Sequence, residues 1–254
     1  MRIKFLGVGE AFDEDLPNTA IQVLVEQAGV EHCILLDCGP TVPTQFWKNC
    51  PDADRLDAIW ISHFHGDHFF GLPALLAKFR QMNRTKPLLI VSQQGAAQIV
   101  TQTIGLAYPS VLSKLGYDLN FVAVEPGEMV KASGLTWRSA LNGHSRRDLA
   151  VRIEAGGKAL FYSGDGAPTA ETLALAHGAQ LAIHEAFRLD TQVPGHATVW
   201  GCIEFARRAN VGRLALVHVE SSDRRLRRAE ILRALATLPD REAFMPEPGD
   251  QTSI

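Results

Sequence analysis

Apolar residues recur along the chain with different spacings, which predict strands in some segments and helices in others. Apolar positions alternate through residues 19–27, and short apolar runs fill residues 31–39 and 56–62, a pattern typical of strands. Residues 71–82 and 94–107 are instead predicted to form helices. Strands dominate the first third of the chain, and strands alternate with helices afterwards. This order predicts two sheets with helices packed on their outer faces.

The remaining segments follow the same logic. We expect further strands and helices in chain order: a strand at 3–9, a short helix at 41–50, a strand at 87–92, two or three strands within 119–144, a β-hairpin over 149–165 that turns at Gly156-Gly157, a strand at 179–185, a helix at 197–210, a strand at 213–219 and a long helix at 224–238.

Composition limits the class of protein. No internal repeat or low-complexity linker divides the 254 residues, so we expect one domain over residues 1–254. A net charge of −3 gives no overall electrostatic case for nucleic-acid binding. No apolar run is long enough to predict a membrane span, and the start lacks the long apolar segment of a secretory signal. The four cysteines form no C-x-x-C pair and are interpreted as reduced packing residues, which favours a cytoplasmic location.

Residues able to bind metal follow several of the predicted strands. These residues, each at or just beyond the end of an apolar run, are His63, His144, Asp165, His184 and His218. In α/β folds the active site usually lies at the carboxyl ends of the strands. If these strand ends point the same way, the five side chains converge on one rim.

The densest group of candidate ligands lies at residues 63–68. His63, His65, Asp67 and His68 follow the apolar strand 56–62 directly, and packing alone does not explain such a group. Imidazole and carboxylate suit zinc, and also manganese or iron. The H-x-H pair can reach one metal, and the next two residues can reach a second. The sequence therefore predicts a metal site, for which residues of later strands can supply further ligands.

The stretch SHFHGDH at residues 62–68 resembles the H-x-H-x-D-H motif of the metallo-β-lactamase superfamily. Four more features match the superfamily in order: LLDCG before the motif, His144 in NGHS, Asp165 in YSGD and His218 in LVHVE. The resemblance implies an α/β fold in which two mixed sheets are flanked by helices, the αββα sandwich. It also implies a set of seven ligands for two divalent metal ions: His63, His65 and His144 for the first, Asp67, His68 and His218 for the second, and Asp165 for both.

The resemblance also implies the chemistry of this site. Zinc is the expected metal, with manganese and iron as alternatives, and a hydroxide that bridges the two ions would be the nucleophile. Two cations lower the pKa of bound water and stabilise charge on the attacked centre. Asp67 is expected to accept a proton from the attacking water as well as to bind metal. Asp37, in the LLDCG stretch, is expected to orient one of the ligand histidines.

A second group of residues indicates one branch of the superfamily. The HEAF stretch at residues 184–187 resembles the HEAT motif of ribonuclease Z-like enzymes, and His196 in GHAT resembles the histidine of their HST motif. The resemblance implies that Glu185 and His196 stabilise the transition state and protonate the leaving oxygen. Cleavage of a phosphodiester expels an alkoxide, which benefits from a cationic histidine held by a carboxylate. We therefore predict a ribonuclease Z-like phosphodiesterase.

The chain also departs from that branch. In the short bacterial enzyme, a flexible arm that grips tRNA is inserted between the ligands that match His144 and Asp165. In this chain a hairpin alone separates these residues. We therefore expect a small or modest-sized phosphodiester as substrate, and RNA stays open as an alternative. The resemblance further implies a homodimer.

Two other functions remain open. A lactonase or thioester hydrolase of the same superfamily can share all seven ligands, but its chemistry does not need Glu185 with His196. A non-catalytic, metal-bound sensing module would usually have lost a ligand, and none is missing from this sequence.

Two further interpretations concern arginines. Arg146 and Arg147 closely follow a ligand residue in the sequence and could touch a substrate anion. The arginine-rich segment 224–238 is interpreted as an amphipathic helix with four apolar residues facing inward: Leu226, Ile231, Leu232 and Leu235.

Overall fold

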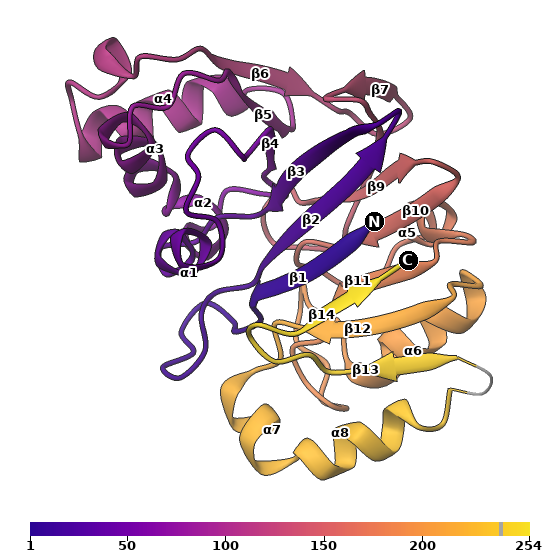
Figure 1. Cartoon of the computed structure of the whole chain (residues 1–254). Coiled ribbons are helices and arrows are strands. Elements are labelled where there is room, and N and C mark those ends of the chain that lie inside the picture. Colours follow the sequence, from indigo (N-terminus) through magenta and orange to yellow (C-terminus); the bar gives the residue numbers. More distant parts are fainter. Residues whose placement is uncertain (239–240) are drawn as a thin grey trace.

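In the part of the chain that the structure describes, two seven-stranded sheets lie face to face, and helices cover their outer surfaces (Figure 1). This computed structural model describes residues 1–238 and 241–254. The predicted αββα fold, with two mixed sheets flanked by helices, is confirmed. No helix in the described ranges has the length and apolar character required to cross a membrane.

The first sheet has the strand order β14-β1-β2-β3-β4-β5-β6. Strands β14, β1, β2 and β3 pair antiparallel, whereas β3 to β6 run parallel. Its strands, in chain order, are β1 (Arg2–Gly7), β2 (Ala20–Gln27), β3 (Val30–Leu36), β4 (Ala58–Trp60), β5 (Leu88–Ser92), β6 (Leu119–Ala123) and β14 (Gln251–Ser253). The closing strand β14 brings the two chain termini side by side, as Figure 1 shows.

The second sheet has the order β13-β12-β11-β10-β9-β8-β7. In this sheet β7 to β10 pair antiparallel and β10 to β13 run parallel. Its strands are β7 (Met129–Ala132), β8 (Leu135–Leu141), β9 (Leu149–Ala155), β10 (Lys158–Tyr162), β11 (Leu181–Glu185), β12 (Arg213–Val217) and β13 (Glu242–Phe244). The predicted hairpin is confirmed: Gly156 and Gly157 both take positive φ angles, 54° and 74°, as the central residues of a type I′ hairpin turn do.

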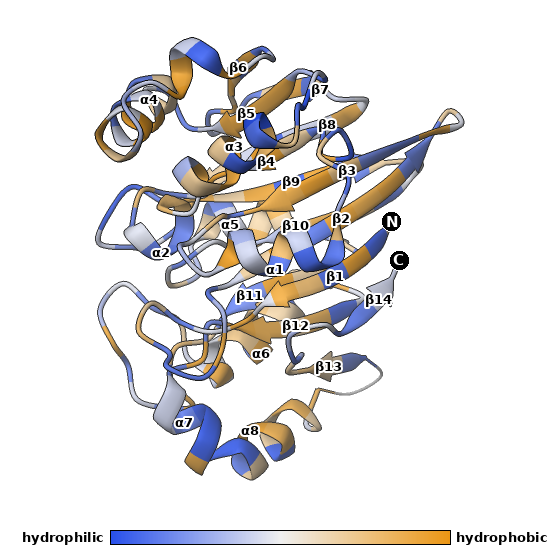
Figure 2. Ribbon diagram, turned by 60° about the vertical axis from the view of Figure 1, so that its left-hand side comes forward, coloured by the Kyte–Doolittle hydropathy of each residue, from blue (hydrophilic) through white to orange (hydrophobic). Residues whose placement is uncertain are grey.

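Three apolar layers hold these sheets and helices together. The central layer lies between the sheets, where the indole rings of Trp60 and Trp137 stack with centroids 6.2 Å apart. Most strands of both sheets are accordingly largely orange, the hydrophobic colour, in Figure 2, whereas β14 is blue to white. A second layer packs the first sheet against its helices, and a third does the same for the second sheet. The helices are α1 (Val42–Asn49), α2 (Gly66–Phe69), α3 (Leu72–Gln81), α4 (Ala96–Ala107), α5 (Ala170–Ala176), α6 (Val199–Arg208), α7 (Ser221–Leu226) and α8 (Arg228–Leu235), with a 3₁₀ turn at Leu112–Lys114.

The prediction of one long helix over residues 224–238 was wrong. The backbone of Arg227, with φ −113° and ψ 16°, leaves the helical region and divides this segment into α7 and α8. Ile231 and Leu235 are buried as expected, but Leu226 and Leu232 are exposed. Arg224 is buried in their place, and its guanidinium donates to the carbonyl oxygen of Pro246.

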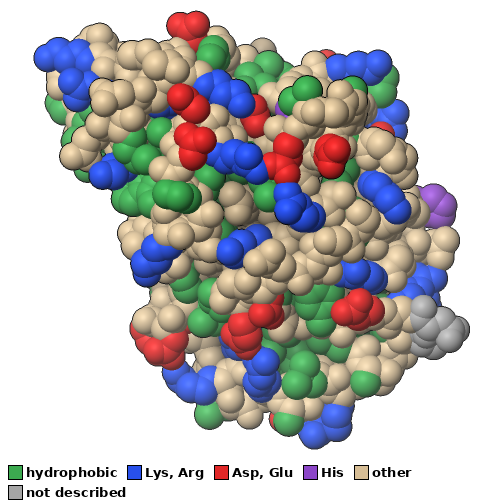
Figure 3. All heavy atoms as spheres, in the orientation of Figure 1, with side chains coloured by type: hydrophobic (Ala, Val, Ile, Leu, Met, Phe, Trp, Pro, Cys, Tyr) green, Lys and Arg blue, Asp and Glu red, His purple; other side chains and the backbone are tan. Residues whose placement is uncertain are grey.

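The arginines of this segment are paired with carboxylates. Arg225 lies 3.4 Å from Glu14, and Arg228 lies 2.7 Å from Glu247. On the face shown in Figure 3, blue and red side chains are interspersed rather than gathered by sign. Arg225 and Arg228 therefore lie on a solvated surface where carboxylates balance their charge, and they do not form a continuous basic patch.

Candidate metal centre

The ends of four strands bring the candidate ligands together. His63 and His65 follow β4, and Asp67 and His68 lie in the short helix α2 that comes next. The other three come from the opposite sheet, after β8, β10 and β12: His144, Asp165 and His218. All seven residues predicted from the sequence therefore meet at one edge of the sandwich.

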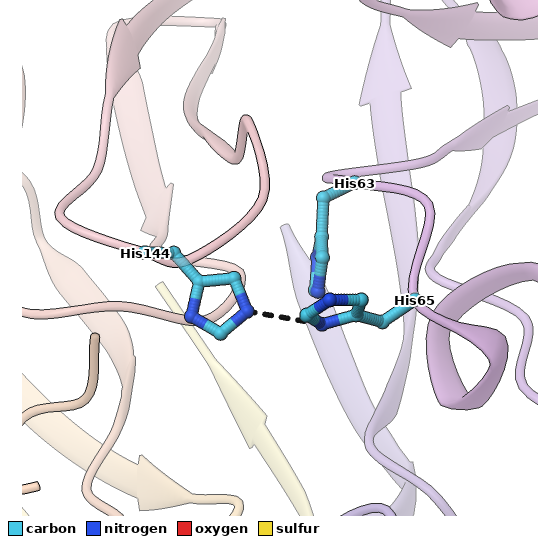
Figure 4. Close-up of side chains that lie close together, drawn as sticks. All are labelled: His63, His65 and His144. Carbon is cyan, nitrogen blue, oxygen red and sulfur yellow. Dashed lines mark hydrogen bonds between the residues drawn. The ribbon is translucent and has the colours of Figure 1, made fainter. Parts of the chain in front are cut away.

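Three imidazoles form the first group. His63, His65 and His144 each offer a ring nitrogen, and these atoms lie within 4.8 Å of one another. Figure 4 shows the rings approaching from two separate loops, with Nε2 of His144 3.0 Å from Nδ1 of His65. Three histidine nitrogens around one point match the ligand type and number of a metal site with an open position.

Two carboxylates and two imidazoles form the second group. Nε2 of His68 lies 3.1 Å from Asp67 and 3.4 Å from Asp165. Nε2 of His218 lies 3.3 Å and 3.4 Å from the same two carboxylates. Ligand atoms of all four residues fall within 4.8 Å of one another, and His144, Asp165 and His196 form a further such group. Asp165 thus lies between the two halves of the site.

Two buried carboxylates and one partly buried carbonyl oxygen fix the orientation of three of the histidines. The Nδ1 atom of His63 faces Asp148 at 2.8 Å, and that of His68 faces Asp37 at 2.7 Å. The Nδ1 atom of His144 lies 2.7 Å from the carbonyl oxygen of Gly195. With Nδ1 held from behind, Nε2 of each ring is left for the centre of the cluster. This is how ligand histidines are normally supported in metal sites.

The cluster contains polar atoms that the protein itself does not satisfy. Nε2 of His63 is buried without a hydrogen-bond partner, and Nε2 of His68 and Oδ1 of Asp165, although 3.4 Å apart, are buried without a well-aligned hydrogen bond. Such atoms are costly to leave unpaired, and divalent cations would satisfy all three. The donor set, imidazole plus carboxylate, fits zinc, manganese or iron. The residues present therefore fit the divalent metal ions that this fold implies.

Asp37 has the role expected for it. Its carboxylate accepts hydrogen bonds from the Ser62 amide at 2.8 Å, the Ser62 hydroxyl at 2.8 Å and the Tyr162 hydroxyl at 2.6 Å, besides facing His68. Its backbone takes a positive φ of 59°, which few non-glycine residues adopt. The Asp37 carboxylate therefore connects the end of β4, strand β10 and helix α2 around the cluster.

Asp148 was missed by the sequence reasoning. Besides facing His63, its carboxylate accepts a hydrogen bond from the Asp165 amide at 3.0 Å, so it holds one residue from each group. Burial and the Asp165 charge raise the pKa of Asp148 in the protein alone. The available signal was weak: a lone acid before the apolar strand β9, between two ligand residues.

Glu185 and His196 meet beside the cluster. Oε1 of Glu185 lies 3.3 Å from Nδ1 of His196, and it also accepts the Gly166 and Ala197 amides at 2.9 Å each. Burial lowers the pKa of His196, but the Glu185 carboxylate outweighs burial and raises it. The Phe187 ring stacks on the imidazole, with centroids 4.6 Å apart. The pair predicted from HEAF and GHAT is thus assembled.

One expectation about this region was wrong, and the structure does not support the suggested contact of Arg146 and Arg147 with a substrate anion. His184 does not reach the rim, because it lies on the face of β11 that packs against α6. Its ring contacts Phe205 with centroids 4.9 Å apart, and its Nδ1 faces the Glu185 carbonyl oxygen at 2.8 Å. The Arg147 guanidinium does not face the metal cluster; it pairs with Glu125 and Gln93. Arg146 is exposed and does not line the cavity beside the cluster.

A cavity of about 590 Å³ opens beside the cluster. It is lined by ligands of both groups, by His196 and by apolar residues of the loops around them. A space of this size suits a compact organic molecule, since small-ligand sites span roughly 300–1,000 Å³.

Comparison with known proteins agrees with this geometry. The family model described as "Beta-lactamase superfamily domain" matches residues 32–219. Ribonuclease Z from Methanosarcina acetivorans is 26% identical in an alignment 275 positions long, which spans 87% of this chain and 88% of the relative.

Two solved structures share the fold. A metallo-beta-lactamase fold protein from Bacillus subtilis has a TM-score of 0.80 at 20% identity, covering 99% of this chain and 98% of that chain. The short form of human tRNase Z has a TM-score of 0.79 at 23% identity, covering 100% and 99%. The chain belongs to the beta-lactamase superfamily, is ribonuclease Z-like within it, and is a metal-dependent hydrolase.

Proposed function

We propose that this protein is a phosphodiesterase that depends on two divalent metal ions. The observation that carries the proposal is the Glu185–His196 pair beside the metal cluster, with Oε1 and Nδ1 3.3 Å apart. Attack on a phosphodiester must expel an alkoxide, and a histidine held by a buried carboxylate can protonate it. A thioester expels a thiolate, which has no comparable need for this acid, whereas a lactone also expels an alkoxide and is therefore a necessary control substrate.

We assign the seven clustered residues to the two ions. His63, His65 and His144 would hold the first, Asp67, His68 and His218 the second, and Asp165 would contact both. Two such ions, when bound, supply an activated water and stabilise charge on the attacked phosphorus. Zinc is the proposed metal because histidine dominates the donor set, and manganese and iron suit the same donors.

The protein's own residues would orient the reaction and move its protons. Asp67 lies 11% exposed at the edge of the cavity, where its carboxylate can accept a proton from the attacking water as well as bind metal. Glu185 is fully buried, and its amide contacts to Gly166 and Ala197 fix its position. His196 lines the cavity and can deliver a proton to the leaving oxygen.

The short connection between two ligand residues supports a small or modest-sized substrate. Between His144 and Asp165 the chain forms only the hairpin of β9 and β10, closed by two glycines. A tRNA-gripping arm at this position is therefore not part of the proposal, and RNA stays among the substrates to be tested. A cytoplasmic homodimer remains a prediction from the sequence and the resemblance.

Hydrolysis of an aryl phosphodiester tests this proposal directly. The purified protein is stripped of metal, reloaded with zinc, and assayed with 4-nitrophenyl phosphodiesters, with a lactone and a thioester in parallel. We expect zinc-dependent turnover of the phosphodiester that exceeds both controls. Turnover of a lactone or thioester alone would contradict the proposal and leave only the superfamily membership.

A further inference from the structure

The cavity beside the metal cluster has an unusual apolar rim. Phe12 and Phe70 both line it, and their side chains are 89% and 56% exposed. Large aromatic rings left in water at a binding site are typical of surfaces that a ligand covers. Pro40 and Phe187 extend the same apolar lining toward His196.

A contact holds the backbone of Phe12 and another holds the ring of Phe70. The loop that carries Phe12 is fixed by Glu10, a buried carboxylate whose Oε2 accepts the Phe12 amide at 2.8 Å. The Phe70 ring lies against Gly66, where an added Cβ would come within 2.8 Å of it. Gly66 separates the ligand residues His65 and Asp67 in the sequence. One exposed ring is therefore held directly beside the metal cluster.

The charge of the cavity limits what can bind there. Within the described part of the chain, none of its lining residues is Lys or Arg, and Glu10 adds a further carboxylate. Bound metal ions and His196 would supply all the positive charge. The cavity has no cationic side chain to neutralise the additional phosphates of a polyanion. Its charge and apolar rim instead suit a molecule with one phosphate and one uncharged ring.

We propose that Phe12 and Phe70 form a stacking subsite for a nucleobase, so that the substrate class is a compact phosphodiester of a single nucleoside. This inference rests on the proposed function and narrows it. Bases stack on aromatic side chains regardless of their hydrogen-bonding edges, so the subsite favours nucleosides over plain sugars without choosing one base. The cavity volume of about 590 Å³ is compatible with one nucleotide.

Binding of two phosphates that differ only by the base tests the subsite. Adenosine 5′-monophosphate and ribose 5-phosphate are titrated by calorimetry into the zinc-loaded protein. We expect the nucleotide to bind roughly tenfold more tightly, the ratio that one base stacked on one ring produces. Equal affinities in the wild type would overturn the inference.

Variants of the exposed rings sharpen this measurement. Phe12→Ala is expected to reduce the affinity ratio to roughly one-third or less of its wild-type value, and Phe12→Tyr to retain most of it. Leu106→Ala, which removes a side chain that is 88% exposed on α4 outside the cavity, is the matched control and should leave the ratio unchanged. An unchanged ratio in both Phe12→Ala and Phe70→Ala would contradict the proposed subsite.

The experiment separates failure of the subsite from failure of the proposed function. Thymidine 5′-(4-nitrophenyl) phosphate is assayed for turnover with the same preparations. A base-dependent affinity without turnover of any phosphodiester would support the subsite and contradict the phosphodiesterase. Turnover with equal affinities for the two phosphates would support the phosphodiesterase and overturn the subsite.

Discussion

Oε1 of Glu185 lies 3.3 Å from Nδ1 of His196, and the same oxygen accepts two backbone amides. The two amides therefore fix the position of the Glu185 carboxylate independently of His196. His196 contacts Glu185 with one edge of its ring and lines the cavity, so it can transfer a proton to a bound substrate. In the proposed mechanism Glu185 would act through His196, so substitutions of the two residues should have different effects.

Replacing His196 by alanine should remove the proton donor and leave the metal ligands in place. We expect His196→Ala to lower the kcat for a phosphodiester with a poor alkyl leaving group by about 100-fold or more. Turnover of the 4-nitrophenyl ester should fall less, because that leaving group needs no proton. Metal content, measured by mass spectrometry, should match the wild type. Equal losses with both leaving groups would argue against a role as leaving-group acid.

Glu185→Gln should shift the pH dependence of kcat/KM and leave the fold of the protein unchanged. The Glu185 charge raises the pKa of His196 against the opposing effect of burial, and a glutamine can still accept the two amides. An acid is active while protonated, so kcat/KM should fall as the pH rises through the pKa of His196. Without the carboxylate that pKa is lower, and the alkaline limb should move to lower pH. Glu204→Gln, at an exposed site on α6, is the control and should keep the wild-type limb.

Asp148→Asn should weaken metal binding although this residue is not a proposed ligand. Its carboxylate faces His63 at 2.8 Å and accepts the Asp165 amide at 3.0 Å, so it orients one residue in each group. Loss of such a supporting carboxylate typically costs about 10- to 100-fold in metal affinity. Competition with a chromophoric chelator would measure this loss. The exposed Asp118→Asn variant should bind metal as the wild type does, and an identical affinity in Asp148→Asn would refute the supporting role.

Sequence analysis identified residues that a local pattern indicates and missed a residue whose role depends on a long-range contact. His63, His65, Asp67 and His68 lie within six positions, and His144, Asp165 and His218 each follow an apolar strand. Asp148 precedes β9 of the second sheet and contacts His63, which follows β4 of the first sheet. No local sequence pattern indicates that contact. The strand spacing explains the error at His184: successive side chains of β11 face opposite sides, so Ile183 enters the central layer while His184 faces the helices.

Helix ends were the other source of error. Apolar and basic residues run through 224–238 without a glycine or proline to indicate a break, so the sequence favoured one helix. The break at Arg227 accompanies its pairing with Asp190, 2.8 Å away in a loop distant in sequence. A long-range contact of this kind cannot be deduced from local periodicity.

Removing metal should destabilise the protein. In the protein alone, buried carboxylates and unpaired imidazole nitrogens face one another, and bound cations would stabilise the folded state. A ligand at about a thousand times its Kd adds roughly 4 kcal/mol of stability. We therefore expect a chelator to lower the Tm by several degrees, and added zinc to restore it. A Tm that does not respond to chelator or zinc would count against metal binding by this cluster.

Gly39→Ala should disrupt the loop that carries the ligand motif. A Cβ at position 39 would lie 1.9 Å from the backbone oxygen of Asp67 and 2.9 Å from the Asn18 side chain, and backbone cannot yield as a flexible side chain can. Relief of the overlap must displace Asp67 or the β3–α1 loop, so we expect a loss of about 3 kcal/mol or more in the free energy of unfolding.

Gly105→Ala is the matched control for that substitution. Gly105 lies within α4 with open space around its α-carbon, so alanine there should be neutral or stabilise the protein by up to about 1 kcal/mol. Urea unfolding of the two variants and the wild type measures both effects. If Gly39→Ala unfolded at the same urea concentration as Gly105→Ala, the close approach of Gly39 to Asp67 would not be what fixes the motif. If it unfolded earlier and also bound zinc more weakly, the contact would link the stability of the fold to the geometry of the metal centre.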